Sequence, residues 1–161
     1  MMDIKGKDSG KFIKENIGLY ISDVKSVVDD GGKFFLRITG TSMLPFLKNG
    51  RDVAVLSKPS GLKKYETAFY VRSNGHVVLH RIVAEHGGFY DFCGDHQTEI
   101  EKNIPKENVI AVMREYEKDG KLYSCNKMSY KIKAVLWVKS RLVRKYSRKI
   151  KIKIKHLVKQ Q

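Results

Sequence analysis

Two residues in separate apolar segments could form a nucleophile and its base. Ser42 comes shortly after a predicted strand, two residues beyond Gly40, and Pro45 stops that strand from continuing. His80 lies inside the apolar run 77–83. A serine hydroxyl becomes a good nucleophile when a neighbouring base takes its proton. If folding brings these two side chains together, the pair predicts attack on a carbonyl carbon, the chemistry of a serine hydrolase.

The surroundings of both residues suit these roles. Strand alternation places His80 on the same face as Val78 and Ile82, while Arg81 points to the other face. Burial on an apolar face would keep the imidazole neutral near neutral pH, as a general base must be. A serine on a sharp corner has backbone N–H groups nearby, and the N–H of Ser42 is the candidate donor for an oxyanion hole.

A carboxylate could hold the imidazole in one tautomer. Asp95 follows the predicted strand 89–93, and Glu99 and Glu101 come soon after it. In a catalytic triad the third member is a carboxylate that accepts a hydrogen bond from the histidine ring. Asp95 could instead bind its own backbone in a turn.

Two rival sites use some of the same residues. A metal site would combine the run Cys93-Gly94-Asp95-His96 with one further histidine, but the spacing matches no established zinc pattern and a second cysteine pair is missing. The further histidine would be His76, His80 or His86. A lysine base would come from Lys63 or Lys64, which lie beside a predicted turn. We therefore expect neither a metal nor an organic cofactor.

The elements that position these residues are mostly strands. Short apolar runs at 34–38, 52–56, 67–71, 77–83, 89–93 and 109–115 are separated by Gly, Asn, Ser and Pro. The sequence Ser73-Asn74-Gly75 predicts a hairpin turn. An amphipathic helix is predicted over 10–30, with apolar residues at helical spacing. The fold class is thus mainly β, with coiled antiparallel sheets or a partial barrel, an N-terminal helix and a basic C-terminal helix.

Charge divides the chain. Its 161 residues carry a net charge of +15, yet no Asp or Glu follows Asp119, and residues 120–161 contain 14 Lys and Arg. Residues 1–119 are nearly neutral, with 18 basic and 17 acidic residues. We predict three segments: an N-terminal helical segment at 1–32, a β domain at 33–118 and a basic amphipathic tail at 119–161.

The tail suggests where the protein works. On a helical wheel one face carries Ile132, Val135, Leu136, Leu142, Val143, Tyr146, Ile150, Ile154 and Leu157. Apolar residues opposite Lys and Arg predict a helix that lies on an anionic membrane surface or an acidic partner, and Trp137 would suit the headgroup region. The alternative is a helix packed on the body with its basic face in solvent. No module that reads nucleic acid accompanies the tail, so we do not expect a nucleic-acid partner.

Other signals limit the location. No apolar run reaches the length needed to span a bilayer, and the N-terminus lacks the apolar core of a secretory signal. We expect a peripheral membrane protein bound through 129–161, or a cytoplasmic one. Cys93 and Cys125 are predicted to be free thiols, because two cysteines make no disulfide framework.

The order of four short motifs resembles the S24/S26 peptidases, which include type I signal peptidases and the self-cleaving LexA-like repressors. The motifs are Gly40-Thr41-Ser42-Met43-Leu44-Pro45, Gly50-Arg51-Asp52-Val53, Leu79-His80-Arg81-Ile82 and Gly94-Asp95. The resemblance covers residues 33–115. The His-Arg-hydrophobic motif is similar to the endoplasmic-reticulum and archaeal branch of the signal peptidases, which uses a Ser–His pair.

This resemblance implies a serine endopeptidase with Ser42 as nucleophile and His80 as general base. The third residue of that branch is an aspartate beyond the Gly-Asp pair, and this position corresponds to Glu101, so Asp95 and Glu101 are both candidates. The implied substrate is a protein or leader peptide. The alternatives are a self-cleaving LexA-like regulator and a catalytically inactive module that binds peptides or membranes.

Overall fold

The computed structural model describes residues 20–147 and 150, and these residues form a mainly β fold with three helices. Eight antiparallel strands make one sheet in the order β1-β2-β7-β3-β4-β5-β6, and β8 pairs with β7. The strands are β1 Phe34–Arg37, β2 Val53–Ser57, β3 Thr67–Val71, β4 Val77–His86, β5 Phe89–Cys93, β6 Glu101–Pro105, β7 Val109–Lys118 and β8 Lys121–Ser124. The helices are 20–29, α2 Met128–Lys139 and the segment 141–147, and a short 3-10 turn spans Lys106–Asn108.

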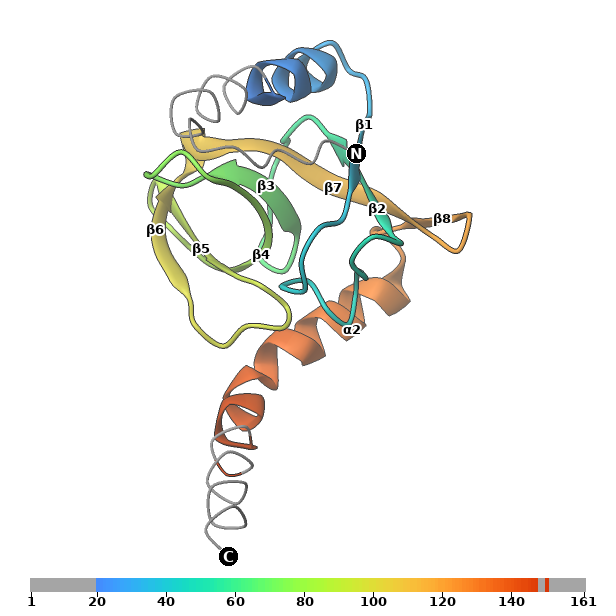
Figure 1. Ribbon diagram of the computed structural model, residues 1–161. Helices are drawn as coiled ribbons and strands as arrows, with labels where there is room; N and C mark the ends of the chain where they lie inside the picture. Colours follow the sequence, from blue (N-terminus) through green and yellow to red (C-terminus); the bar gives the residue numbers. More distant parts are fainter. Residues whose placement is uncertain (1–19, 148–149, 151–161) are drawn as a thin grey trace, which may run out of the picture.

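The sheet curls strongly at β3–β6, as Figure 1 shows. The register shifts within four of the strand pairs, including the β4–β5 pair between Ile82 and Ala84. Such irregularities bend a strand and increase its local twist, which lets an open sheet coil. The predicted hairpin at Ser73-Asn74-Gly75 joins β3 to β4, with Gly75 in the left-handed region at φ +83°.

Two apolar clusters lie on opposite faces of the sheet. In β3, Phe69 belongs to the larger cluster, whereas its neighbours Ala68 and Tyr70 belong to the smaller one. The helix at 20–29 covers the larger cluster and buries Val24 and Val28 completely. Residues 20–29 of the helix predicted over 10–30 are therefore helical and pack on the body. The first half of the predicted helix lies outside the described residues.

The six predicted strands are confirmed, and two further strands were not predicted. β6 has one strongly apolar residue, Ile104, and β8 is only four residues long. β8 lies beyond residue 118 yet pairs with β7 through Lys118 and Lys121. The sheet thus continues into the segment that charge alone assigns to the tail.

The C-terminal helices follow the sheet. After α2, a turn at Ser140 leads into the helical segment 141–147. The sequence suggested a place for Trp137 in the headgroup region of a membrane. In the structure Trp137 lies against the body, where its Nε1–H donates a hydrogen bond to the backbone oxygen of Asp95 at 2.7 Å. Within residues 20–147 and 150, no helix combines the length and apolar character required to cross a bilayer.

Candidate functional site

Ser42 lies in a turn that follows β1 and is anchored in the core on both sides. Ile38 precedes the turn, and Met43 and Leu47 lie within and after it; all three side chains are buried. Gly40 begins the turn at φ +82°, a backbone conformation that residues with a side chain rarely adopt. Because these apolar side chains are buried, they fix the backbone on both sides of the short polar stretch that contains Ser42. That stretch lies at the surface.

A second loop holds the turn in place. The backbone oxygen of Ser42 accepts a hydrogen bond from the N–H of His96 at 2.7 Å. A Cβ atom at Gly94 would lie 2.9 Å from that same oxygen and 2.8 Å from Oε1 of Gln97. Only glycine allows the two backbones to approach this closely, which explains the Gly-Asp motif in physical terms.

His80 lies beside the start of this loop. On β4 it directly precedes Arg81, which pairs with Cys93 at the end of β5. The imidazole is 2% exposed, and His80 and Ser42 line the same pocket of about 500 Å³. The structure thus brings the predicted nucleophile and base to one cavity, although the two side chains make no direct hydrogen bond within the described part of the chain.

Both polar contacts of the His80 ring involve Nδ1. This atom lies 3.0 Å from Oε1 of Glu101 and 3.4 Å from the hydroxyl of Tyr70. Among the described residues, Nε2 makes no hydrogen bond. If Nδ1 carries the proton, Nε2 presents a lone pair, which is the arrangement that a general base requires.

Glu101 is itself held by Arg72. The guanidinium donates two hydrogen bonds to the carboxylate, at 2.7 Å from Nε and 2.5 Å from the terminal nitrogen. Burial alone would raise the pKa of Glu101, but hydrogen bonds from Arg72 and Tyr70, together with the charges of His80 and Arg72, lower the pKa below its ordinary value. Glu101 is therefore ionised near neutral pH and can accept a hydrogen bond from Nδ1–H of His80.

Burial also sets the protonation state of the histidine. Desolvation lowers the pKa of His80 below its ordinary value, although the charge of Glu101 opposes this shift. The ring is consequently neutral near pH 7. A neutral imidazole with Nδ1–H bound to a carboxylate has the tautomer and charge needed to remove a proton at Nε2.

Asp95, the other predicted candidate, binds elsewhere. Its carboxylate forms two hydrogen bonds of 2.7 Å with Arg81, and both side chains are buried. Arg81 also donates to the backbone oxygen of Tyr65 and lies 4.6 Å above the ring of Phe46. This pair fixes the loop that supports Ser42, and Glu101 is the carboxylate that reaches the His80 ring.

The pocket beside Ser42 has mostly apolar walls. They come from β1, β3 and β4, from Tyr20 of the N-terminal helix and from the Ser42 turn itself. The main apolar wall residues are Phe34, Leu36, Ile38, Met43, Phe69, Val77 and Leu79. A cavity of this kind fits an extended chain with apolar or small side chains better than a charged ligand.

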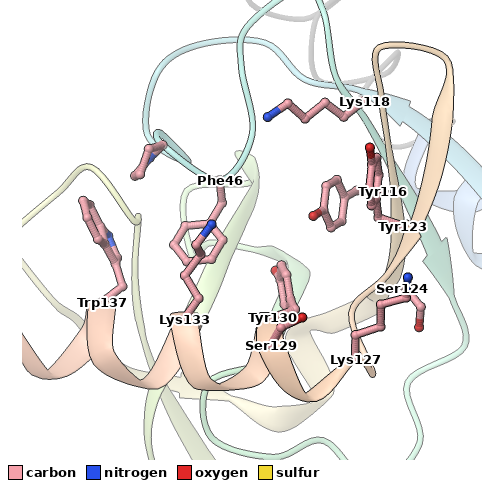
Figure 2. Close-up of a pocket in the computed structure, with 11 residues that line it drawn as sticks. Phe46, Tyr116, Lys118, Tyr123, Ser124, Lys127, Ser129, Tyr130, Lys133 and Trp137 are labelled. Carbon is pink, nitrogen blue, oxygen red and sulfur yellow. The ribbon is translucent and has the colours of Figure 1, made fainter.

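A second pocket, of about 330 Å³, lies behind the turn. Figure 2 shows Tyr130, Lys133 and Trp137 pointing from α2 toward Phe46. The ring of Phe46 meets Tyr130 and Trp137 edge to face, with centroids 5.7 and 6.1 Å apart. Phe46 belongs to the same turn as Ser42, so α2 is packed against the segment that carries the candidate nucleophile.

Comparison with family models, with curated proteins and with solved structures gives no match. The likeness to the S24/S26 peptidases therefore depends on the four sequence motifs and stays a prediction. Within the described residues, no group of three His, Cys, Asp or Glu side chains could hold a metal ion.

Arg72 is the site residue that sequence reasoning missed. It follows β3 in the hairpin that leads to β4 and gave no signal of its own, because surface arginines beside turns are common. Its role depends on β6, which brings Glu101 next to it. Without that strand the sequence offers no reason to join the two residues, which lie 29 positions apart.

Proposed function

We propose that this protein is a serine endopeptidase of the signal-peptidase-like type, in which Ser42 is the nucleophile, His80 the general base and Glu101 the residue that orients the base. The observation that carries the proposal is the hydrogen bond from the buried His80 ring to an ionised Glu101, in a pocket that Ser42 also lines. The coiled β architecture of the LexA and signal peptidase type is part of the same proposal.

In both halves of the reaction His80 first takes a proton and then gives it back. Nε2 of His80 takes the proton of the Ser42 hydroxyl as Oγ attacks the substrate carbonyl carbon. The tetrahedral intermediate collapses to an acyl-enzyme, and the imidazolium returns the proton to the leaving amine. Water, deprotonated by His80, then attacks the acyl-enzyme, and the proton returns to Ser42 as the ester bond breaks.

The step requires the Ser42 hydroxyl to reach Nε2, a hydrogen bond that the unliganded chain does not make. Catalytic hydrogen bonds are often long or absent without substrate and tighten in the complex. Ser42 is partly exposed in its turn, so rotation about its Cα–Cβ bond involves no rearrangement of the core. Its backbone N–H donates no hydrogen bond to another described residue and is the candidate oxyanion donor.

The proposed substrate is an extended protein or leader peptide with small residues before the cleaved bond, as the family resemblance implies. The apolar walls of the pocket beside Ser42 support this substrate class, since they offer contacts to small uncharged side chains. Charged side chains at these positions would lose hydration without gaining a partner.

A labelling experiment tests the proposal. A serine-reactive phosphonate should modify Ser42 in the native protein, as found by mass spectrometry of the digested adduct. Ser42→Ala should abolish the adduct and His80→Ala should slow its formation by a factor of at least about 100. His76→Ala is the matched control, because His76 is exposed in the β3–β4 turn and should label at the native rate.

Because signal-peptidase-like sites can resist serine reagents, cleavage of a peptide library by the same three variants is the second measurement. Library cleavage that survives in Ser42→Ala would contradict the proposal. Loss of intact mass by the protein alone, absent in Ser42→Ala, would identify the self-cleaving regulator. Peptide binding without any cleavage, unchanged in both site variants, would identify the inactive module.

A further inference from the structure

The C-terminal helices contact the body through one face only. On α2, Ala134 is 1% exposed, and the rings of Tyr130 and Trp137 pack on Phe46. Figure 2 shows Tyr130 and Trp137 on the side of α2 that faces the body, and the burial of Ala134 places it on the same side. The spacing of four and three residues places them on one side of α2, so the opposite side faces outward.

The outward side of α2 carries large apolar side chains, with the exposed Lys139 among them. Large hydrophobic side chains on it are between 52% and 70% exposed, at Met128, Ile132, Leu136, Leu142, Val143, Tyr146 and Ile150. We refer to these seven residues as the apolar stripe. Met128, Ile132 and Leu136 are four residues apart and share one side of α2. Leu142, Val143 and Tyr146 share one side of the helix that follows, and Ile150 is four residues beyond Tyr146.

The stripe continues across the turn at Ser140. The Ser140 N–H donates to the backbone oxygen of Leu136 at 2.9 Å, and the Arg144 N–H donates to the oxygen of Ser140 at 3.0 Å. The first bond closes α2 and the second opens the helix that follows, and the path of the chain bends between the two helices in Figure 1. Apolar side chains are exposed on both sides of this bend. An exposed apolar row of this length is unusual on a protein surface and marks an interaction site.

The charges beside the stripe indicate its partner. Residues 120–161 carry 14 Lys and Arg and no acidic residue. Lys131 and Lys139 are exposed on α2 and have no ion-pair partner among the described residues. Pairing of two stripes from two copies would bring these cations together, which is unfavourable. An anionic bilayer supplies both an apolar layer and the opposite charge.

We propose that the apolar stripe binds the surface of an anionic lipid bilayer, with its side chains in the acyl boundary and the ammonium groups of Lys131 and Lys139 at the headgroups. The body then stands on the far side of α2, away from the lipid. This inference does not rest on the peptidase proposal, because it uses no residue of the Ser42 pocket.

Flotation with lipid vesicles tests the inference on the full chain. The protein should float with vesicles of phosphatidylcholine and phosphatidylglycerol and remain at the bottom with phosphatidylcholine alone. Leu136→Glu, in the stripe, should lower the partition coefficient roughly tenfold or more. Leu122→Glu is the matched control: Leu122 lies on β8, is 55% exposed against 62% for Leu136, and should change binding less than about twofold.

Three outcomes would overturn the inference. The first is equal loss of binding in both variants, which would reflect general surface charge. The second is no flotation of the unaltered protein with the anionic vesicles. The third is a dimer, seen by light scattering, that Leu136→Glu dissociates while vesicle binding stays the same, which would make a second copy the occupant. Circular dichroism of both variants checks that the fold is retained.

Discussion

Replacing Glu101 with glutamine should disable His80 while leaving the pocket in place. Arg72 donates to both carboxylate oxygens, Nε to Oε2 and the terminal nitrogen to Oε1, and Oε1 is also the atom that contacts Nδ1 of His80. In the variant one of these oxygens becomes an NH2 group that only donates, so it faces an Arg72 N–H and the two-point contact is lost. The ring loses the negative charge that stabilises the imidazolium in the transition state, and an NH2 group at the Oε1 position would also force the proton from Nδ1 to Nε2.

The expected cost follows from the lost charge and from the disturbed hydrogen bond at Nδ1. An amide in place of the carboxylate of a serine–histidine–aspartate triad lowers kcat by about 10⁴-fold. Glu101 is partly exposed, so water can offset some of the loss, and we expect a decrease of roughly 10²- to 10⁴-fold, or about 3–5 kcal/mol of barrier. Stability should change less, because the ion pair with Arg72 is partly solvated.

The pH dependence gives a second readout. Activity requires neutral His80, so it is lost as the pH falls through the pKa of the ring. Burial lowers that pKa and the charge of Glu101 raises it. Removing the charge should therefore move the acidic limb of the rate profile to lower pH while the plateau falls. A purely structural role for Glu101 would lower the plateau without this shift.

The assay is the rate of Ser42 modification by a phosphonate, followed by intact mass over a range of pH. Glu99→Gln is the control, since Glu99 is 83% exposed and pairs only with Lys145 among the described residues. The reasoning is refuted if Glu101→Gln and Glu99→Gln label at the same rate, or if the acidic limb of Glu101→Gln moves to higher pH.

Three further changes test the support around the site. Gly94→Ala places a methyl group 2.9 Å from a backbone oxygen and should destabilise the fold by about 1–3 kcal/mol in urea unfolding, whereas Gly88→Ala, with open space around it, should not. Asp95→Asn leaves the charge of buried Arg81 unpaired and should lower the free energy of unfolding by about 3–5 kcal/mol by the same measurement. Burial raises the pKa of Cys125 to about 11, so its alkylation by iodoacetamide at neutral pH should be far slower in the native protein than in urea.

The sequence predicts the strands whose apolar runs are uninterrupted and misses those stabilised by their neighbours. β6 reads Glu-Lys-Asn-Ile-Pro, and its extended form depends on pairing with β5. β8 did carry a local signal, because Asp119 and Gly120 both have positive φ in the tight turn between β7 and β8. Asp-Gly between two strands is a strong hairpin pattern, and the low hydrophobicity of the flanking residues concealed it.

The choice between the two carboxylates depends on sheet register, which the sequence alone does not reveal. Arg81 pairs with Cys93 across the β4–β5 ladder. Asp95 lies two residues after Cys93, and residues two apart along an extended chain point to the same face. The carboxylate of Asp95 therefore follows the face of Arg81, and the two buried groups form an ion pair.

The neighbouring ladder leads to the opposite face. Ile82 pairs with Phe92, and Phe92 pairs with Glu101 on β6, so these three residues form a row across three strands. His80 lies two residues before Ile82 and shares its face, where Glu101 contacts it. A shift of one residue in the β5–β6 pairing would turn Glu101 away from the imidazole. The identity of the orienting carboxylate is thus determined by β6, the strand with the weakest local signal near the site.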